Sequence, residues 1–378
     1  MRWGELGWVV CLAGLPFAHF LFPKTLTLWS AQATWAQAWV LGLSAVALSL
    51  PSRPKQANWP LTVWVIWVSG LTGMTFFTSV LEAKVYPHVL LMAFLHLLSL
   101  IGFYQAALAM WTRHTLQRLF HACAWVSVVV MFYAGLQLAN LDQFFDPLPG
   151  GGTHDELSGT IGNPTHLAAY LSLTLPLLLV RTGWGWRLAT VANGVLLLRC
   201  GSAAGLLGAW VGSLLTTWLL GQRRLCGIIA GVGLVGGIGM AVVKDGLNPF
   251  GRLAAWQVFW SVFVHRPITG FGPGFTLAMT QNAPPGPIHL WHHVHNEYLQ
   301  IALEQGLIGL GLVLWGLVVT WRWVGRLPKT RELAVCAGIL LVFLTNSLLN
   351  FPAHLWMLSS LGLMAYTGIY VLASEEMT

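Results

Sequence analysis

The stretch "HLWHHVHNEYLQIALEQGLIGL", residues 289–310, joins a histidine-rich loop to the start of a long apolar run. The run continues to about residue 321, and about 20 apolar residues are enough to cross a bilayer as an α-helix. The stretch therefore predicts an α-helix that enters a membrane directly after a polar loop. Its four histidines need a separate explanation.

The composition of the whole chain indicates the same class of protein. Of the 378 residues, 56% are hydrophobic and 8% are charged, whereas soluble proteins carry roughly 25% charged residues. The 21 tryptophans fit membrane interfaces, where tryptophan is enriched. The net charge of +7 does not indicate a nucleic-acid partner, because the basic residues lie mostly in short loops between apolar runs. The five scattered cysteines form no disulfide or zinc-binding pattern.

About twelve apolar runs have a usable length for membrane spans. The expected fold is an all-α integral membrane protein with about 12 transmembrane helices, in which residues 1–378 form a single polytopic membrane domain. The boundary between the seventh and eighth runs is the weakest, because only Arg199, Cys200 and Gly201 separate them. The expected runs are 6–22, 33–50, 60–80, 87–110, 119–139, 161–180, 185–200, 203–221, 225–243, 297–321, 333–351 and 355–373.

Two long connections, 140–160 and 244–296, are expected to be external loops. With a cytoplasmic N-terminus and alternating spans, thirteen of the 19 Lys and Arg residues fall inside, in agreement with the excess of positive charge in cytoplasmic loops. The first connection ends at Asn163-Pro164, where Asn163 can cap the next helix. The histidine cluster lies at the end of the second connection and therefore also faces outward.

The loop 244–296 is expected to contain a short helix that lies along the outer interface and ends at Pro267. The glycine-rich sequence "GFGPGF", 270–275, has no strand before it and is not a nucleotide-binding loop. It is expected to be a turn that lets the backbone pass close to another segment. Five residues of the short helix have helical spacing and are expected to share a face against lipid or the bundle: Arg252, Trp256, Phe259, Trp260 and Phe263.

The four histidines admit three interpretations. A metal site needs ligands that converge at fixed geometry, and the absence of an HExxH pattern argues against it, so neither a metal nor a cofactor is expected. A polar collar at the entrance of the helix would give the histidines no chemical role. The third interpretation makes His295 a catalytic base or binding group, with Asn296 and Glu297 placed to orient its ring by hydrogen bonds.

Glu297, Gln300 and Glu304 are spaced by three and four residues and therefore lie along one helix face. A carboxylate within a span is costly and usually faces the interior of a bundle or a water-filled cavity. This face is therefore expected inside the protein, either beside a substrate or in an ion pair with an arginine of a neighbouring span.

Three arginines near the expected outer surface are candidate phosphate-binding groups, because guanidinium binds phosphate by paired hydrogen bonds and stays charged in apolar surroundings. Arg199 lies near the end of an apolar run, Arg252 opens the interfacial helix and Arg266 closes it. The alternative is that each side chain extends to the lipid headgroups, and this alternative is strongest for Arg266.

Together these motifs resemble the O-antigen ligase and O-antigen polymerase superfamily. The resemblance rests on Arg252 with a tryptophan four residues later, on "RPITGFGPGF" (266–275) and on "HVHNEYLQIALEQGLIGL" (293–310). The segments "TIGNPTHLAAYLSLTLPLLL" and "NSLLNFPAHLWMLSSLGLMAY" extend the similarity over roughly residues 155–370.

The resemblance implies a polytopic, metal-independent glycosyltransferase that takes a glycan from an undecaprenyl-diphosphate carrier. It implies that Arg252 is the family's loop arginine and that His295 is its histidine. A further family arginine follows a serine, but here Ser202 is followed by alanines and the nearest arginine is Arg199. On a continuous helix Arg199 would lie one turn from Ala203, on the same face.

The expected reaction transfers an O-antigen-like glycan to an acceptor hydroxyl with inversion. Arg199 and Arg252 would hold the diphosphate, and His295 would accept or position the hydroxyl proton. The remaining candidates are expected to bind substrate or support its cavity: Arg266, Asn296, Glu297, Gln300, Glu304 and Asn163.

Lipid A–core is the slightly favoured acceptor, which would make the protein an O-antigen ligase. A second carrier-linked glycan (polymerase) and a protein hydroxyl (O-oligosaccharyltransferase) are alternatives. A lipid or glycan transporter is the alternative from another class, although the sequence lacks evident inverted repeats, and a zinc membrane hydrolase is a weaker one. The expected location is a bacterial inner membrane with the site facing the periplasm and with membrane lipid, not nucleic acid, as a partner.

Overall fold

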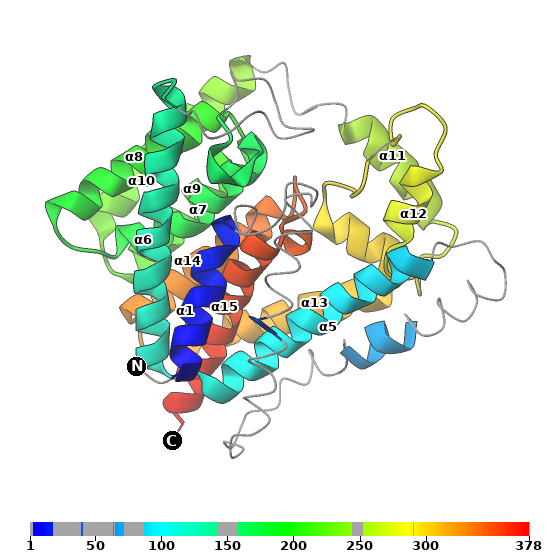
Figure 1. Cartoon of the computed structure of the whole chain (residues 1–378), viewed down its shortest axis with the longest axis horizontal. Helices are drawn as coiled ribbons and strands as arrows, with labels where there is room; N and C mark the ends of the chain where they lie inside the picture. Colours follow the sequence, from blue (N-terminus) through cyan, green and yellow to red (C-terminus); the bar gives the residue numbers. More distant parts are fainter. Residues whose placement is uncertain are drawn as a thin grey trace.

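Regular structure in the described part of the chain is entirely helical. The structure is a computed structural model that describes residues 3–17, 39–40, 63, 65–71, 87–141, 157–243, 252–289 and 291–377. These ranges contain α-helices and short 3₁₀ helices without a β-strand, arranged as a bundle with α11 and α12 at one corner (Figure 1). The all-α part of the expected fold is therefore confirmed.

From residue 87 onward the helices follow the expected runs closely, and the runs 33–50 and 60–80 lie largely outside the described residues. The helices are α1 (Trp3–Gly14), η1 (Leu15–Phe17), α5 (Pro87–Met110), α6 (Arg113–Leu138), η2 (Gly159–Ile161), α7 (Pro164–Leu179), α8 (Trp184–Cys200), α9 (Ala203–Leu219), α10 (Arg223–Val243), α11 (Arg252–Phe263), α12 (Phe275–Gln281), α13 (Glu297–Arg326), α14 (Arg331–Asn346), η4 (Pro352–His354) and α15 (Trp356–Glu375).

Three described helices, α6, α13 and α15, are long and apolar enough to cross a bilayer. The described ranges add shorter apolar helices, such as the 16-residue α7. At a rise of 1.5 Å per residue α7 is about 24 Å long, which is less than the roughly 30 Å hydrocarbon core. The membrane character is thus supported, but the described helices do not confirm the expected count of about 12 spans.

The boundary between α8 and α9 is real. Gly201 ends α8 in the left-handed conformation (φ 63°), and the Ser202 side chain caps α9 by accepting a hydrogen bond from the Gly205 N–H at 3.3 Å. Arg199 and Ala203 therefore belong to different helices. The expectation that a continuous helix places them on one face is wrong.

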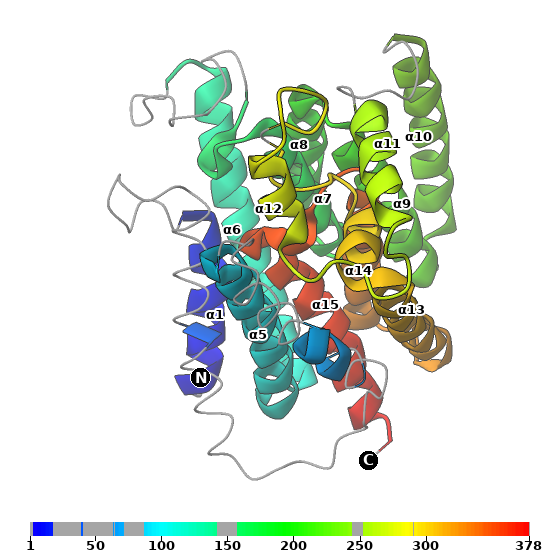
Figure 2. The same ribbon diagram turned by 90° about the vertical axis from the view of Figure 1, so that its right-hand side faces the viewer.

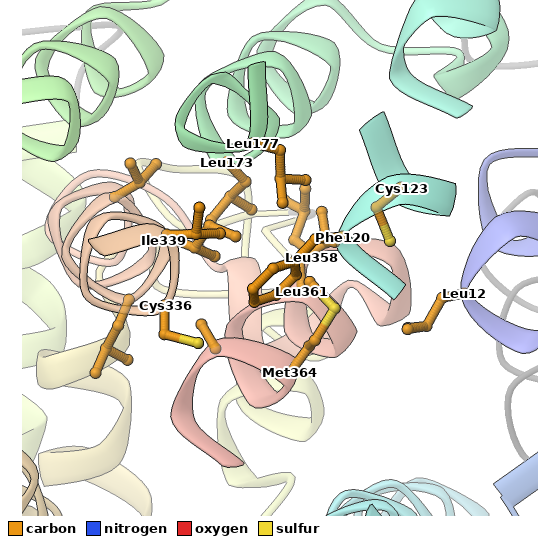
Figure 3. Close-up of a cluster of buried hydrophobic side chains, with 14 of the residues drawn as sticks. Leu12, Phe120, Cys123, Leu173, Leu177, Cys336, Ile339, Leu358, Leu361 and Met364 are labelled. Atoms are coloured by element: carbon orange, nitrogen blue, oxygen red, sulfur yellow. The ribbon is translucent and has the colours of Figure 1, made fainter. Parts of the chain in front are cut away.

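The core is formed where α14 packs against α9, α7 and α15. Small residues allow the close approach of α9 and α14: a Cβ added to Gly212 would overlap Val342, and one added to Gly338 would overlap Thr216. Figure 3 shows the adjoining apolar cluster, in which side chains from α1, α6, α7, α14 and α15 meet: Leu12, Phe120, Cys123, Leu173, Leu177, Cys336, Ile339, Leu358, Leu361 and Met364.

Charged contacts gather at the end of the bundle that holds the first turn of α1 and the last turn of α15. Arg118 pairs with Glu5, and Arg113 pairs with Glu332 at 2.9 Å and donates its backbone N–H to Glu375 at 3.0 Å. In the turned view of Figure 2 the two marked termini again lie away from α11 and α12. This end of the bundle therefore holds Arg113 and Arg118, two of the residues that are expected in the cytoplasm.

Helix α13 is broken at Gly306, whose φ of 69° and ψ of −174° are not helical. The break leaves backbone N–H and C=O groups of α13 without helical hydrogen-bond partners, and the loop 267–272 supplies these partners. Non-helical backbone within an apolar span is tolerated where other parts of the protein form its hydrogen bonds. The bonds run from Phe271 N to Leu303 O (3.0 Å), Gly272 N to Glu304 O (2.8 Å), Leu307 N to Pro267 O (2.8 Å) and Ile308 N to Ile268 O (3.3 Å).

This docking confirms the expectation that "GFGPGF" lets backbone pass close to another segment. A Cβ added to Gly270 would lie 2.5 Å from the carbonyl carbon of Glu304. The expected span 297–321 is therefore correct in extent, but it is not one continuous helix.

Substitution of Gly306 by alanine should destabilise the protein strongly. The added Cβ would overlap the Ile268 carbonyl, and the backbone conformation is open essentially to glycine alone, so the cost should exceed about 2 kcal/mol. Thermal unfolding in lipid nanodiscs measures the effect. Gly311→Ala is the matched control on the same helix, because a Cβ there meets nothing within 4 Å. Equal melting temperatures for the two variants would contradict the broken-helix geometry.

Candidate active site

Helix α11 places Arg252 in the protein interior. Arg252 is only 9% exposed, and Phe259 and Phe263 on the same face pack into an apolar cluster with Val294 of the histidine loop. The expected face is therefore confirmed for these residues, and it lies against the bundle. Trp260 is the exception, because it is 56% exposed.

The histidine loop is fixed to α11 and α13 through the peptide groups of Val294. The Trp256 Nε1–H donates to the Val294 carbonyl at 2.9 Å, and the Val294 N–H donates to Gln300 Oε1 at 3.2 Å. Trp256 follows Arg252 by one helical turn, and His295 follows Val294 directly. These two bonds therefore set the position of His295 relative to Arg252.

His295 has an uncommon backbone conformation and an unsatisfied ring nitrogen. Its φ is 56°, in the left-handed region that non-glycine residues rarely adopt. Its Nδ1 is buried and has no hydrogen-bond partner among the described residues. The ring packs edge-on to Trp291 and Phe351, with centroids 4.8 and 4.7 Å away. A strained residue with an unused polar atom is a functional candidate.

Burial and then the charge of Arg252 lower the pKa of His295 to about 4. Both disfavour the imidazolium form, so the ring is neutral near pH 7 and keeps a nitrogen lone pair that can accept a hydrogen bond. Burial also lowers the pKa of Arg252, but the ordinary value of an arginine is so high that the guanidinium remains charged.

The face of α13 that carries Glu297, Gln300 and Glu304 lies inside the protein, as expected, with each residue at most 7% exposed. The alternative of an ion pair with an arginine does not hold for Glu297, which accepts the Ala353 N–H at 2.7 Å and whose carboxylate lies 3.2 Å from Nδ1 of His354.

Gln300 and Glu304 connect this face to its surroundings. Gln300 Nε2 lies 3.3 Å from Glu304 Oε1 and 3.1 Å from His354 Nε2. The Glu304 carboxylate accepts the N–H groups of Gly274 and Thr276 at 3.1 and 3.3 Å. One polar network thus joins α13, the glycine-rich loop and η4.

The matched family model accounts for this arrangement of motifs. Residues 188–314 match a model described as O-Antigen ligase. Residues 188–314 are therefore similar to the O-antigen ligase family. The match confirms the resemblance to the O-antigen ligase and polymerase superfamily and includes Arg252, His295 and the polar face of α13. A search of curated proteins found no match.

Two of the expected site residues act as helix caps. Asn163 accepts the N–H groups of Thr165 and His166, which confirms its expected capping role. The Asn296 side chain caps α13 by accepting the Leu299 N–H at 3.0 Å. Asn296 and Glu297 bond to other groups, and in the described residues neither has a hydrogen bond to the His295 ring, so the expectation that they orient the ring by hydrogen bonds is wrong.

The other two arginines lie on the surface. Arg266 is exposed and its guanidinium stacks over Phe271 at 5.3 Å, which fits a structural role. Arg199 is exposed at the end of α8. In the described residues no hydrogen bond or ion pair connects Arg199 with His295, so the place of Arg199 in the candidate site stays a prediction.

The neighbouring histidines have different environments. His292 is exposed, and His289 bonds through Nδ1 to the Ala283 carbonyl at 2.8 Å. His293 instead stacks on Phe351 at 4.5 Å and contacts His354 at 4.4 Å. The collar interpretation therefore fails for His293.

The sequence analysis missed the residues that α7 and η4 bring to the candidate site. The Phe351 ring contacts His293 and His295 and also His166, whose centroid lies 5.5 Å away. A polar break with a histidine, "NFPAH" (350–354), was a usable signal for His354. Within the described ranges no group of three His, Cys, Asp or Glu residues is arranged to hold a metal ion.

Proposed function

We propose that the protein transfers a glycan from an undecaprenyl-diphosphate carrier to an acceptor hydroxyl at the outer face of a bacterial inner membrane. The match of residues 188–314 to the O-antigen ligase family model supports O-antigen ligase-type glycan transfer. The observation that supports the residue assignment best is a strained, neutral His295 next to the buried cation Arg252.

In the proposed reaction the acceptor oxygen attacks the anomeric carbon while its proton passes to the neutral His295. The bond between the sugar and the diphosphate breaks, and its electron pair leaves with the diphosphate. Arg252 stabilises the negative charge that develops there. A direct displacement of this kind inverts the anomeric centre.

Arg199 remains a proposed second diphosphate-binding residue, supported by its exposure at the end of α8, next to the start of α9. Gln300 and Glu304 are proposed to support the substrate cavity from within. Arg266, Asn296, Glu297 and Asn163 are proposed to act on substrate only through the loops and helix ends that they stabilise.

We propose lipid A–core as the acceptor, with a second carrier-linked glycan as the alternative. Purified protein in proteoliposomes would receive carrier-linked glycan with or without lipid A–core. Glycan on lipid A–core supports the ligase, longer glycan on the carrier supports the polymerase, and no transfer in either mixture contradicts both. The same reactions in EDTA test the proposed independence of a metal.

The site should face the outside of the cytoplasmic membrane, because thirteen of the 19 Lys and Arg residues then lie in the cytoplasm. A reporter that is active only outside the cytoplasm, fused at residue 280, should be active, and a fusion at residue 222 should not. The reverse pattern would exclude a periplasmic site and the proposed mechanism with it.

A further inference from the structure

We infer that Glu297, His354 and Gln300 form a positioning network that holds His295 for proton transfer, and that protonation of His354 opens this network. The inference rests on the proposed function of His295. It concerns residues that do not touch the reacting atoms in the proposed reaction.

The orientation of the Gln300 amide follows from two neighbours with fixed roles. The Val294 N–H can only donate, so the atom 3.2 Å from it must be the amide oxygen. The carboxylate of Glu304 accepts, so the atom 3.3 Å from it must be the NH₂ group. A flipped amide would lose both bonds.

This orientation determines the hydrogen positions on His354. Its Nε2 lies 3.1 Å from the Gln300 NH₂ group and must therefore accept a hydrogen bond. Its Nδ1 lies 3.2 Å from the Glu297 carboxylate and must donate. The network is complete only when His354 is the neutral tautomer with hydrogen on Nδ1.

A proton on His354 Nε2 would place two donors opposite each other, 3.1 Å apart. Gln300 would then have to turn, and the Val294 N–H would lose its acceptor. His295 follows Val294 directly, and the ring of Phe351 lies between His293 and His295. A change at His354 can therefore reach His295 through the backbone and through this packing.

His354 can exchange protons with water, because its side chain is 28% exposed. Burial opposes its charge, but the charge of Glu297, the hydrogen bond to Glu297 and the charge of Glu304 together raise its pKa. The titratable groups that face it are Glu297 and Glu304 from α13, His293 from the histidine loop and His96 from α5.

The network predicts at which pH the rate of glycan transfer falls on the acid side of its pH profile, which we call the acid limb. His295 alone would stay neutral down to its pKa of about 4. Because the pKa of His354 is raised above the ordinary value of about 6.5, His354 becomes charged first as the pH falls. Transfer should therefore decline at or above about pH 6.5, not near pH 4.

The experiment compares wild type with His354→Gln, whose amide can still donate to Glu297 and accept from Gln300 but cannot be protonated. The acid limb of transfer should move down toward pH 4 in this variant. His292→Gln removes an exposed histidine of the same loop and should leave the limb unchanged. An identical limb in wild type and His354→Gln would overturn the inference.

A second measurement does not depend on transfer. Nuclear magnetic resonance of ¹⁵N-histidine-labelled protein in nanodiscs, assigned with the two variants, should show His354 as the Nδ1–H tautomer at pH 8. The His295 signal should shift at the pH at which His354 takes its proton. If wild type showed this coupling but no transfer, the proposed function would fail and the network would stand. Independent titration of the two histidines would overturn the network.

Discussion

Replacement of Arg252 by alanine should lower glycan transfer by at least about tenfold. A paired, charge-assisted contact with phosphate is worth about 1.5–3 kcal/mol, and about 1.4 kcal/mol corresponds to a factor of ten in rate. Arg252 is only 9% exposed, so the contact would form with little competition from water. Transfer by purified protein in proteoliposomes, with the binding of carrier lipid measured in parallel, gives the effect.

Two further variants separate charge from geometry. Arg252→Lys should restore only part of the activity, because an ammonium group cannot reproduce the paired hydrogen bonds of guanidinium. Arg266→Ala removes an exposed arginine that stacks on Phe271 and should have a clearly smaller effect. Full activity of Arg252→Ala, or an equal loss in Arg266→Ala, would exclude Arg252 as the main phosphate-binding residue.

Much of the helical architecture after residue 87 could be predicted, because apolar length and caps act locally. Asn163 has the capping role that the sequence predicts, whereas the caps at Gly201 and Ser202 became evident only in the structure. The break at Gly306 could not be predicted from the sequence, since glycine is common within membrane helices. Only the loop that docks on it explains why that position is not helical.

The burial of a site residue could be predicted where it depends only on the residue's own polarity and its spacing along a helix. A face with Glu297, Gln300 and Glu304 cannot lie in lipid, so its burial followed from spacing alone. The partner of Glu297 was not predictable, because His354 is 57 residues away and only the packing of η4 against α13 brings it close. The role of His293 depends on the same long-range contact.

Replacement of His295 by alanine should lower transfer by about 100-fold or more, the range contributed by a general acid or base. Carrier-lipid binding should remain nearly unchanged, because the proposed task of His295 concerns the acceptor. The substitution should not relieve the backbone strain at this position, because alanine is also unfavourable at a φ of 56°. The measurement is transfer under saturating carrier, compared with binding of the same carrier.

The neighbouring histidines make this assignment testable within one loop. His292→Ala should retain activity within about threefold, because surface substitutions usually change free energies by less than 0.5 kcal/mol. His293→Ala should show an intermediate loss, since it removes a ring packed between Phe351 and His354, and its loss should appear in stability as well as in transfer. If His295→Ala kept wild-type transfer while His292→Ala or His293→Ala lost it completely with normal stability, the catalytic base would be a different histidine of residues 289–295. The buried, unsatisfied Nδ1 of His295 and its left-handed backbone conformation favour His295 as the base, because strained residues with unused polar atoms are candidates for function.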